Sequence, residues 1–137
     1  MRYIGFDLGT KTLGVSISDK TGTIASFYKT IEFENENYES LISKVKELID
    51  EYDVNTVVLG LPKNMNNSIG FAGERSINFK NMLEEKLNLN VILEDERLSS
   101  KEANDIMIMG DLSRKKRKKK VDAVAATIIL QRYLDRR

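Results

Sequence analysis

The sequence predicts an α/β fold in which one mixed sheet carries helices on both faces. The first third of the chain alternates apolar and polar residues in three short segments joined by tight turns, which is typical of an antiparallel meander. The remainder alternates helical patterns with short apolar strands, which is typical of parallel βαβ units. The chain has 137 residues, of which 41% are hydrophobic, so we expect one domain spanning residues 1–137.

Three strands are predicted first. Residues 2–8 form the first, in which Asp7 is an acidic side chain among apolar neighbours. Residues 13–18 form the second, and residues 23–31 form the third after a polar turn. A carboxylate within a buried strand is costly unless a positive or hydrogen-bonding partner meets it, so Asp7 needs a partner from the protein or from a ligand.

After residue 37 the hydrophobic period changes from two to about three and a half, as expected for an amphipathic helix. The predicted elements from there on are a helix, a strand, a helix, a strand and two helices, at residues 38–52, 56–62, 68–88, 90–97, 99–110 and 121–134. The helix at 99–110 opens on a capping-box pattern, and the last helix is apolar nearly all round, which predicts burial.

The composition excludes several kinds of site. The chain has no cysteine and no histidine, which rules out disulfides, thiol catalysis, Cys/His zinc sites and Ser-His triads. For a hydrolase, carboxylates that hold hard cations are the chemistry that is left. We find no apolar run long enough to span a membrane and no signal-peptide pattern, so we expect a cytoplasmic protein.

The basic residues are unevenly distributed. Residues 114–120 read RKKRKKK, seven consecutive cations out of 22 Lys and Arg in a chain with 21 Asp and Glu. The rest of the chain is therefore net acidic, and the run has the charge pattern of a site for nucleic acid or another polyanion. We expect it to form a flexible loop that grips substrate; the simpler interpretation is a solvated loop without a partner.

Carboxylates stand at three places where a core pattern would not put them. Asp7 lies in the first strand, three acids end the last strand, and Asp122 begins the final helix. If these elements pack together the acids converge, and Mg²⁺ or Mn²⁺ would supply the charge that keeps them ionised together. One or two such ions could hydrolyse a phosphodiester.

Simpler explanations exist for each acid. Asp7 could pair with a nearby cation, the acids at the strand end could face solvent, and Asp122 could be an acid favoured by the helix dipole. Alternation does not choose among the three strand-end acids, because Glu94 and Glu96 share one face and Asp95 takes the other. Arg97 could bind a phosphate or neutralise these acids.

Four blocks carry a resemblance to a known family: GFDLGTKTLGVSISD at 5–19, VVLGLPKNMNNSIG at 57–70, EDERLSSKEA at 94–103 and VDAVAATIILQRYL at 121–134. Together they resemble the YqgF/RuvX family of Holliday-junction-resolvase-like proteins, also described as pre-16S rRNA nucleases. The resemblance covers about residues 2–135. It implies an RNase H-like fold with a five-stranded mixed sheet in the order 3-2-1-4-5, flanked by helices.

The resemblance also implies a divalent-metal nuclease and assigns residues to it. Its catalytic and metal-binding acids match Asp7, Glu96 and Asp122, with one or two Mg²⁺ or Mn²⁺ ions as cofactor. The supporting residues would be Gly9, Thr10 and Asp95. The nucleic-acid contacts would be Lys11, Lys63, Arg97, Arg114, Lys115, Lys116 and Arg117.

The expected function is cleavage of structured nucleic acid, most directly processing of the 5′ end of pre-16S rRNA during ribosome biogenesis. The alternatives are a Holliday junction resolvase acting on branched DNA and a non-catalytic nucleic-acid-binding protein of the same fold. Asp-x-Gly-Thr at 7–10 also resembles the first phosphate loop of actin-like ATPases and sugar kinases, which need two such domains. The sequence leaves open whether the protein is a monomer or a homodimer.

Overall fold

The computed structural model describes residues 2–34, 37–63, 66, 68–95 and 114–136, with the backbone alone at 55 and 114–123. The described elements are β1 (Arg2–Leu8), β2 (Thr12–Ser18), β3 (Ala25–Glu32), α1 (Tyr38–Tyr52), β4 (Val54–Leu61), α2 (Phe71–Leu87), β5 (Asn90–Asp95) and α4 (Arg114–Arg136). None of the helices in this described part of the chain is long and apolar enough to cross a membrane.

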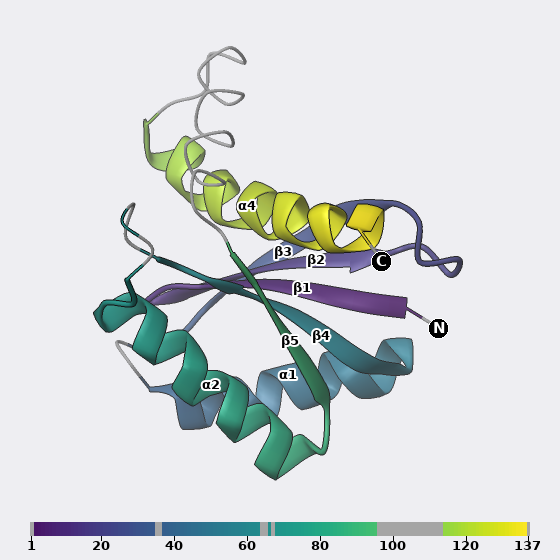
Figure 1. The fold of residues 1–137 in the computed structure, drawn as a ribbon, viewed down its shortest axis with the longest axis horizontal. Helices are drawn as coiled ribbons and strands as arrows, with labels where there is room; N and C mark the ends of the chain where they lie inside the picture. Colours follow the sequence, from purple (N-terminus) through teal and green to yellow (C-terminus); the bar gives the residue numbers. More distant parts are fainter. Residues whose placement is uncertain (1, 35–36, 64–65, 67, 96–113, 137) are drawn as a thin grey trace.

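The five strands form one mixed sheet in the order β3-β2-β1-β4-β5 (Figure 1). The β1–β2 and β2–β3 pairs are antiparallel, while β1–β4 and β4–β5 are parallel. This arrangement confirms the predicted sheet and its strand order. It puts β1 at the centre, so a side chain on β1 is supported by paired strands on both sides.

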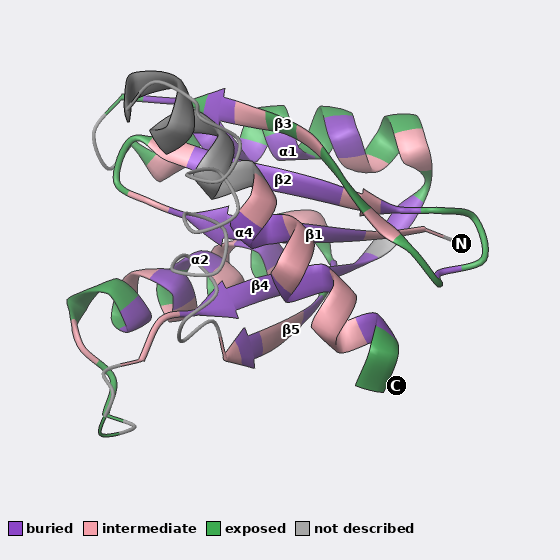
Figure 2. Ribbon diagram, turned by 90° about the horizontal axis from the view of Figure 1, so that it is seen from above, coloured by how far each residue is buried: buried purple, intermediate pink, exposed green. Residues whose placement is uncertain are grey.

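The helices divide between the two faces of the sheet. Helices α1 and α2 cover one face and α4 runs across the other (Figures 1 and 2). The larger apolar cluster lies between the sheet and the α1/α2 layer. A smaller cluster, made of Val58, Ile129, Leu130 and Leu134, lies between the sheet and α4.

Helix α4 approaches the sheet closely because small residues line its path. The Ser16 hydroxyl donates a hydrogen bond of 2.8 Å to the carbonyl of Ala126. At Gly5, an added Cβ would stand 2.7 Å from the Cβ of Leu130 and 2.9 Å from the Ala126 carbonyl oxygen. The absence of a side chain at Gly5 therefore sets the height of the helix above the sheet.

The far end of α4 is tied to the turn between β2 and β3. The Gln131 side chain accepts a 2.8 Å hydrogen bond from the backbone N–H of Ala25 and donates one of 3.0 Å to the carbonyl of Thr23. Two bonds from one amide to residues more than 100 positions away fix the position of α4 along the sheet as well as its height.

The predicted starts of two helices were wrong, and β3 and β4 each start two residues from the predicted position. Helix α4 begins at Arg114 instead of residue 121, so the basic run forms its first turns and is not a flexible loop. Lys and Arg are good helix formers, which allows the apolar helix to extend backwards through them. Helix α2 begins at Phe71 instead of residue 68. The predicted helix at 99–110 lies outside the described residues.

Candidate active site

Helix α4 runs antiparallel to β1, and this direction positions the candidate site. The ring of Tyr133 lies 5.9 Å from that of Tyr3 at the start of β1, and Ala126 lies over Gly5. A step toward the C-terminal end of β1 therefore corresponds to a step toward the N-terminal end of α4. Asp7 lies about 7 Å beyond Gly5 on the strand, and Asp122 precedes Ala126 by about 6 Å along the helix axis. The two positions thus fall at matching heights, one on the sheet and one on the helix above it.

Asp7 stands between two glycines on the face that α4 covers. It pairs with Gly14 of β2, which in turn pairs with Thr30 of β3. On the other side, the β1–β4 register continued by one residue brings Gly60 beside Asp7, and Gly60 pairs with Glu94 of β5. Both strand neighbours of this carboxylate therefore lack a side chain.

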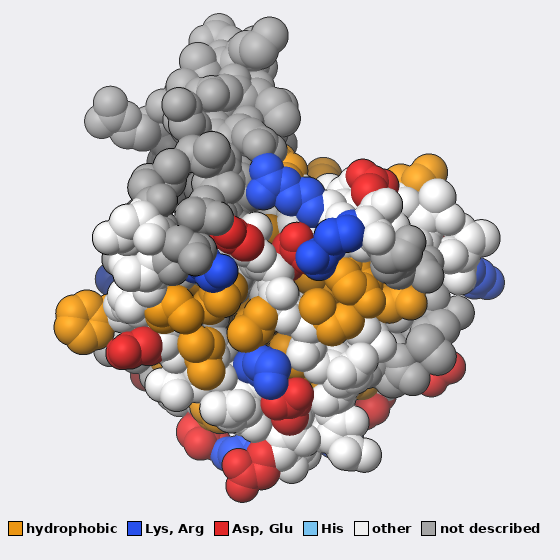
Figure 3. All heavy atoms as spheres, in the orientation of Figure 1, with side chains coloured by type: hydrophobic (Ala, Val, Ile, Leu, Met, Phe, Trp, Pro, Cys, Tyr) orange, Lys and Arg blue, Asp and Glu red, His pale blue; other side chains and the backbone are white. Residues whose placement is uncertain are grey.

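Asp7 and Glu94 are both buried, each 9% exposed, which is unusual for carboxylates. Glu94 has its compensating charge within the protein, because a guanidinium N–H of Arg136 donates to its Oε2. The Arg136 guanidinium also lies 6.0 Å from the centre of the Tyr133 ring. Figure 3 shows Lys and Arg side chains beside acidic ones in this region, where α4 meets β5.

The structure describes the other predicted acids to different extents. Asp95, the last residue of β5, pairs with Leu61, and alternation from Glu94 puts it on the α1/α2 face, away from Asp7. Glu96 and Arg97 lie outside the described residues, and Asp122 is described by its helical backbone alone. Among the side chains that are described, no three potential metal ligands gather.

A sequence profile of the RuvX family, described as "Holliday junction resolvase", matches residues 1–136. The chain belongs to the RuvX family. It is 50% identical over 135 residues to a Geobacillus protein (strain WCH70) named "Putative pre-16S rRNA nuclease", and the match covers 98% of each chain. The resemblance found in the four sequence blocks is thereby confirmed.

Solved structures show how widely this RuvX fold is shared. RuvC of T. thermophilus, solved with a Holliday junction substrate, aligns with a TM-score of 0.61 at 15% identity, covering 99% of this chain and 94% of that one. A ROK family protein from Streptococcus pneumoniae aligns with a TM-score of 0.52 at 18% identity, and the alignment covers only 40% of that protein. The first likeness confirms the RNase H-like fold, and the second extends to less than half of the larger protein.

The turn after β1 carries an exposed cation, and the N–H of its glycine is already hydrogen-bonded. The N–H of Gly9 donates a 2.8 Å hydrogen bond to the carbonyl of Thr12, as in an ordinary hairpin turn, so it is not available to a phosphate. Lys11 is exposed at the tip of that turn. Lys63 is half-buried just after β4, at the same edge of the sheet as the end of β5.

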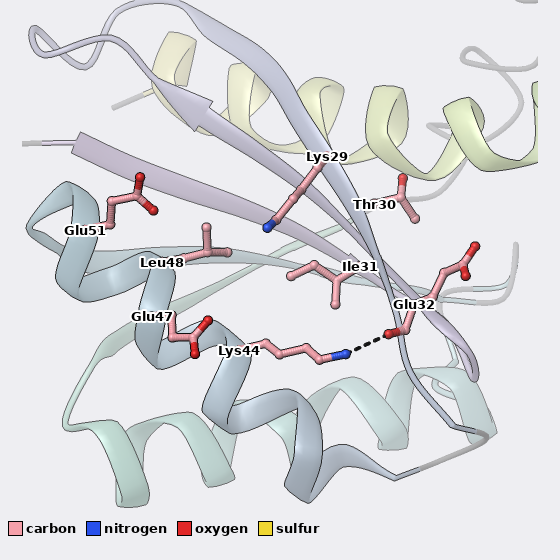
Figure 4. A pocket seen from close by; sticks show the side chains of 8 residues that line it. All are labelled: Lys29, Thr30, Ile31, Glu32, Lys44, Glu47, Leu48 and Glu51. Atoms are coloured by element: carbon pink, nitrogen blue, oxygen red, sulfur yellow. Dashed lines mark hydrogen bonds between the residues drawn. The ribbon is translucent and has the colours of Figure 1, made fainter.

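A hollow in the described part of the protein lies away from Asp7. It occupies about 350 Å³ between β3 and α1, on the sheet face opposite to Asp7 (Figure 4). Glu32, Glu47 and Glu51 line it together with two lysines, of which Lys44 donates a 3.0 Å hydrogen bond to the carbonyl of Glu32. Its acidic lining disfavours a nucleic-acid backbone.

Sequence reasoning missed two features of this RuvX site. One is the pair of glycines beside Asp7, and the other is the ion pair between Glu94 and Arg136. Alternation along β2 could have put Gly14 on the same face as Asp7, but pairing it with Asp7 requires the strand register. No sequence signal links Glu94 to Arg136, which are 42 residues apart.

Proposed function

We propose that this RuvX protein is a metal-dependent endonuclease that cleaves structured RNA, with the 5′ end of pre-16S rRNA as its substrate. Its membership of a nuclease family supports this, as does the name of a relative that is 50% identical over nearly its whole length. The activity would reside in one domain of residues 1–137. A ribosomal RNA precursor as substrate implies action in the cytoplasm.

The chemistry of the available ligands suits magnesium or manganese. Asp7, Glu96 and Asp122 would hold one or two of these ions, since hard cations prefer carboxylate oxygens and the chain has no histidine or cysteine to offer. The position of Asp7 supports this assignment, because it offers a carboxylate between two glycines, where no side chain of a neighbouring strand fills the space on its face. Bound there, the ion would lower the pKa of a water molecule and stabilise the leaving oxygen.

One observation carries the proposal: the antiparallel register of α4 on β1, which brings the helical turn of Asp122 to the height of Asp7. Asp7 sits on the central strand, paired on both sides, so its carboxylate is held by a rigid element. The close packing of α4 at Gly5 and Ser16 excludes water from the layer below the site. Both features favour fixed positions for the reacting groups.

The basic run supports nucleic acid as the partner. Its seven cations form the first turns of the helix that then reaches Asp122, so phosphates bound there would lie next to the proposed reaction centre. Positive charges at a helix N-terminus oppose the helix dipole and repel one another, and a bound polyanion relieves both effects. Lys11, Lys63, Arg97 and the run itself would contact the backbone of the substrate.

Branched DNA is the second candidate, favoured by the description of the family as a Holliday junction resolvase. Resolution of a four-way junction needs two symmetric cuts and therefore a homodimer, whereas trimming of RNA needs one active site. A non-catalytic RNA-binding role is the third candidate. Substrate preference and oligomeric state, measured together, separate these possibilities.

The test is cleavage by the purified protein with Mn²⁺, using a pre-16S RNA fragment and a four-way DNA junction. We expect RNA cleavage that Asp7→Asn and Asp122→Asn each reduce by at least about 10³-fold while RNA binding persists. Asp50→Asn is the matched control, because Asp50 is an exposed acid on α1 paired with Lys46. Full cleavage by both variants would overturn the proposed chemistry, and cleavage of the junction alone would favour branched DNA.

A further inference from the structure

We propose that Phe71 stacks on an unpaired base of the RNA substrate, close to the bond that is cleaved. This inference rests on the proposed function, because it takes RNA as the substrate and Asp7 as part of the reaction centre. It deepens that function by naming the substrate class, which is RNA with a single-stranded segment beside the cleavage site. Phe71 was not among the residues that the sequence predicted to contact nucleic acid.

Phe71 is 88% exposed, although its ring is large and apolar. It is the first residue of α2, and the buried residues of that helix are Gly73, Ser76, Phe79 and Leu83. Because an α-helix has 3.6 residues per turn, Phe71 stands off the face that these residues form. Packing within the fold therefore does not account for an aromatic side chain here. Single exposed apolar residues are common on protein surfaces, so the location of Phe71 must decide its role.

The start of α2 lies at the end of the sheet that holds the candidate active site. Strands β1, β4 and β5 run toward this end, and both α2 and α4 begin there (Figure 1). An added Cβ at Gly73 would stand 2.8 Å from the carbonyl oxygen of Pro62, the residue that follows β4. This close approach fixes the first turn of α2 against the end of β4, which is the parallel neighbour of the strand that carries Asp7.

The two helices begin on opposite faces of the sheet. Helix α4 begins on the face that carries Asp7, and α2 begins on the other face (Figures 1 and 2). An RNA strand whose phosphates contact the basic run at the start of α4 would cross this end of the sheet past Asp7 and reach the first turn of α2. Phe71 therefore lies where bases close to the cleaved bond would pass.

The side chains around Phe71 suit a base better than a phosphate. Ile69, which is 44% exposed, packs against the first turn of α2 and adds apolar surface beside the ring. Glu74 is exposed in that turn, and its charge disfavours a phosphate at the helix N-terminus. An aromatic ring stacks on any base, because every base has a π-face. Bases within a duplex stack on one another, so this contact requires unpaired nucleotides.

The chain offers a matched control in Phe27 of β3, which is 60% exposed. Phe27 pairs with Ser16 of β2, and Ser16 pairs with Gly5 of β1. It therefore lies on an edge strand, two strands from β1, at the level of Gly5 and short of Asp7. The two phenylalanines share their chemistry and a high exposure, and they differ in their distance from the start of α2.

The first experiment measures RNA binding in EDTA, so that its result does not depend on metal or on cleavage. The probes are a pre-16S RNA fragment and the same fragment after its unpaired 5′ segment is annealed to a complementary strand. We expect Phe71→Ala to weaken binding of the first probe by about tenfold or more, the scale of one lost base stack. Binding of the annealed probe should stay unchanged, as should the salt slope, because stacking releases no counterions.

Phe27→Ala should bind both probes as wild type does, and Phe71→Trp should keep the wild-type affinity because it restores an aromatic face. Wild-type affinity of Phe71→Ala for the unpaired probe would overturn the inference. An equal loss on both probes would overturn it as well, because it would show that Phe71 does not distinguish unpaired bases.

The second experiment detects the stack directly, since the chain has no tryptophan of its own. Phe71→Trp and Phe27→Trp each introduce a single tryptophan whose emission is quenched when a base stacks on the ring. We expect the unpaired RNA probe to quench Phe71→Trp and to leave Phe27→Trp unchanged. Equal quenching of the two variants, or none in Phe71→Trp at saturating RNA, would overturn the inference.

The stacking contact and the proposed nuclease activity can fail separately. A loss of binding in Phe71→Ala with quenching in Phe71→Trp, in a protein that cleaves no RNA with Mn²⁺, would support the contact and overturn the nuclease. Cleavage of RNA by the wild type, together with wild-type binding by Phe71→Ala, would support the nuclease and overturn the contact.

Discussion

The two faces of the sheet are built from the same strands but differ in how many large apolar side chains they present. Toward α1 and α2 the strands present large apolar side chains, among them Ile4, Phe6, Leu13, Val15 and Leu59, all at most 1% exposed. Toward α4 the alternate positions hold Gly5, Asp7, Gly14, Ser16 and Gly60. Because side chains alternate along a strand, the same strands contribute to a dense core on one face and to the candidate active site on the other.

This difference indicates that the fold separates stability from the proposed chemistry. The α1/α2 face contributes most of the buried apolar area, so the α4 face can hold glycines, a serine and a carboxylate. Helix α4 still packs firmly, through a close backbone approach at Gly5 and the amide bonds of Gln131. We therefore expect changes on the first face to act on stability and changes on the second to act on binding or cleavage.

The largest stability effect is expected on the α1/α2 face. Phe79 of α2 is 1% exposed, and its ring lies 6.0 Å from that of Tyr38. Truncation in Phe79→Ala leaves a cavity and should lower the free energy of unfolding by about 3–5 kcal/mol. Urea denaturation of Phe79→Ala and wild type measures this difference in the free energy of unfolding. A loss below about 1 kcal/mol would show that this face is not the main source of stability.

A smaller loss is expected where α4 meets the sheet. In Gly5→Ala the new methyl group would press on Leu130 and on the Ala126 carbonyl, so α4 must shift outward. Overpacking of this kind costs about 1–3 kcal/mol. The same denaturation assay should place Gly5→Ala between Phe79→Ala and wild type. An unchanged denaturation midpoint would mean that α4 packs less closely on the sheet than the contacts at Gly5 and Ser16 indicate.

The basic run should affect binding and leave stability nearly unchanged. We expect Lys115→Gln with Lys116→Gln to weaken RNA binding and to lower the slope of log K against log salt by about one to two. The control is Lys46→Gln with Lys86→Gln, which removes two exposed, ion-paired lysines from α1 and α2. Equal slopes for the two double variants would exclude the run as the phosphate contact.

The smallest effect concerns the turn between β2 and β3. Hydrogen bonds from the Thr21 hydroxyl and the backbone N–H groups of Ile24 and Thr23 lower the pKa of Asp19 to about 2. Because the folded-state pKa lies below the ordinary value of 3.8, this contribution to stability is complete above pH 3.8 and is lost as the pH falls through about 2. The Tm difference between wild type and Asp19→Asn should therefore shrink over that interval.

Much of the fold followed from periodicity. The alternation in β1 put Asp7 on one face with Gly5, and the change of period after residue 37 located α1. The start of α4 was missed because a run of like charges gives no apolar period, although Lys and Arg favour helices. The strand order came from the family resemblance, since local patterns do not specify which strands pair.

The site was less predictable, because it depends on contacts between distant segments. Alternation did not choose among Glu94, Asp95 and Glu96, and the family resemblance selected Glu96. The structure adds that Glu94 accepts a hydrogen bond from the guanidinium of Arg136. Likewise, two glycines at positions 14 and 60 become neighbours of Asp7 only through the register of three strands. Such relations are set by tertiary packing, which a single sequence does not reveal.

A crystal structure of the protein soaked with Mn²⁺ tests the central claim most directly, since the anomalous signal of manganese locates the ion. We expect an ion bound by the carboxylates of Asp7 and Asp122, at metal–oxygen distances of about 2.1–2.3 Å. An occupied site that lacks either carboxylate, or carboxylates too far apart to share an ion, would contradict the proposed nuclease chemistry.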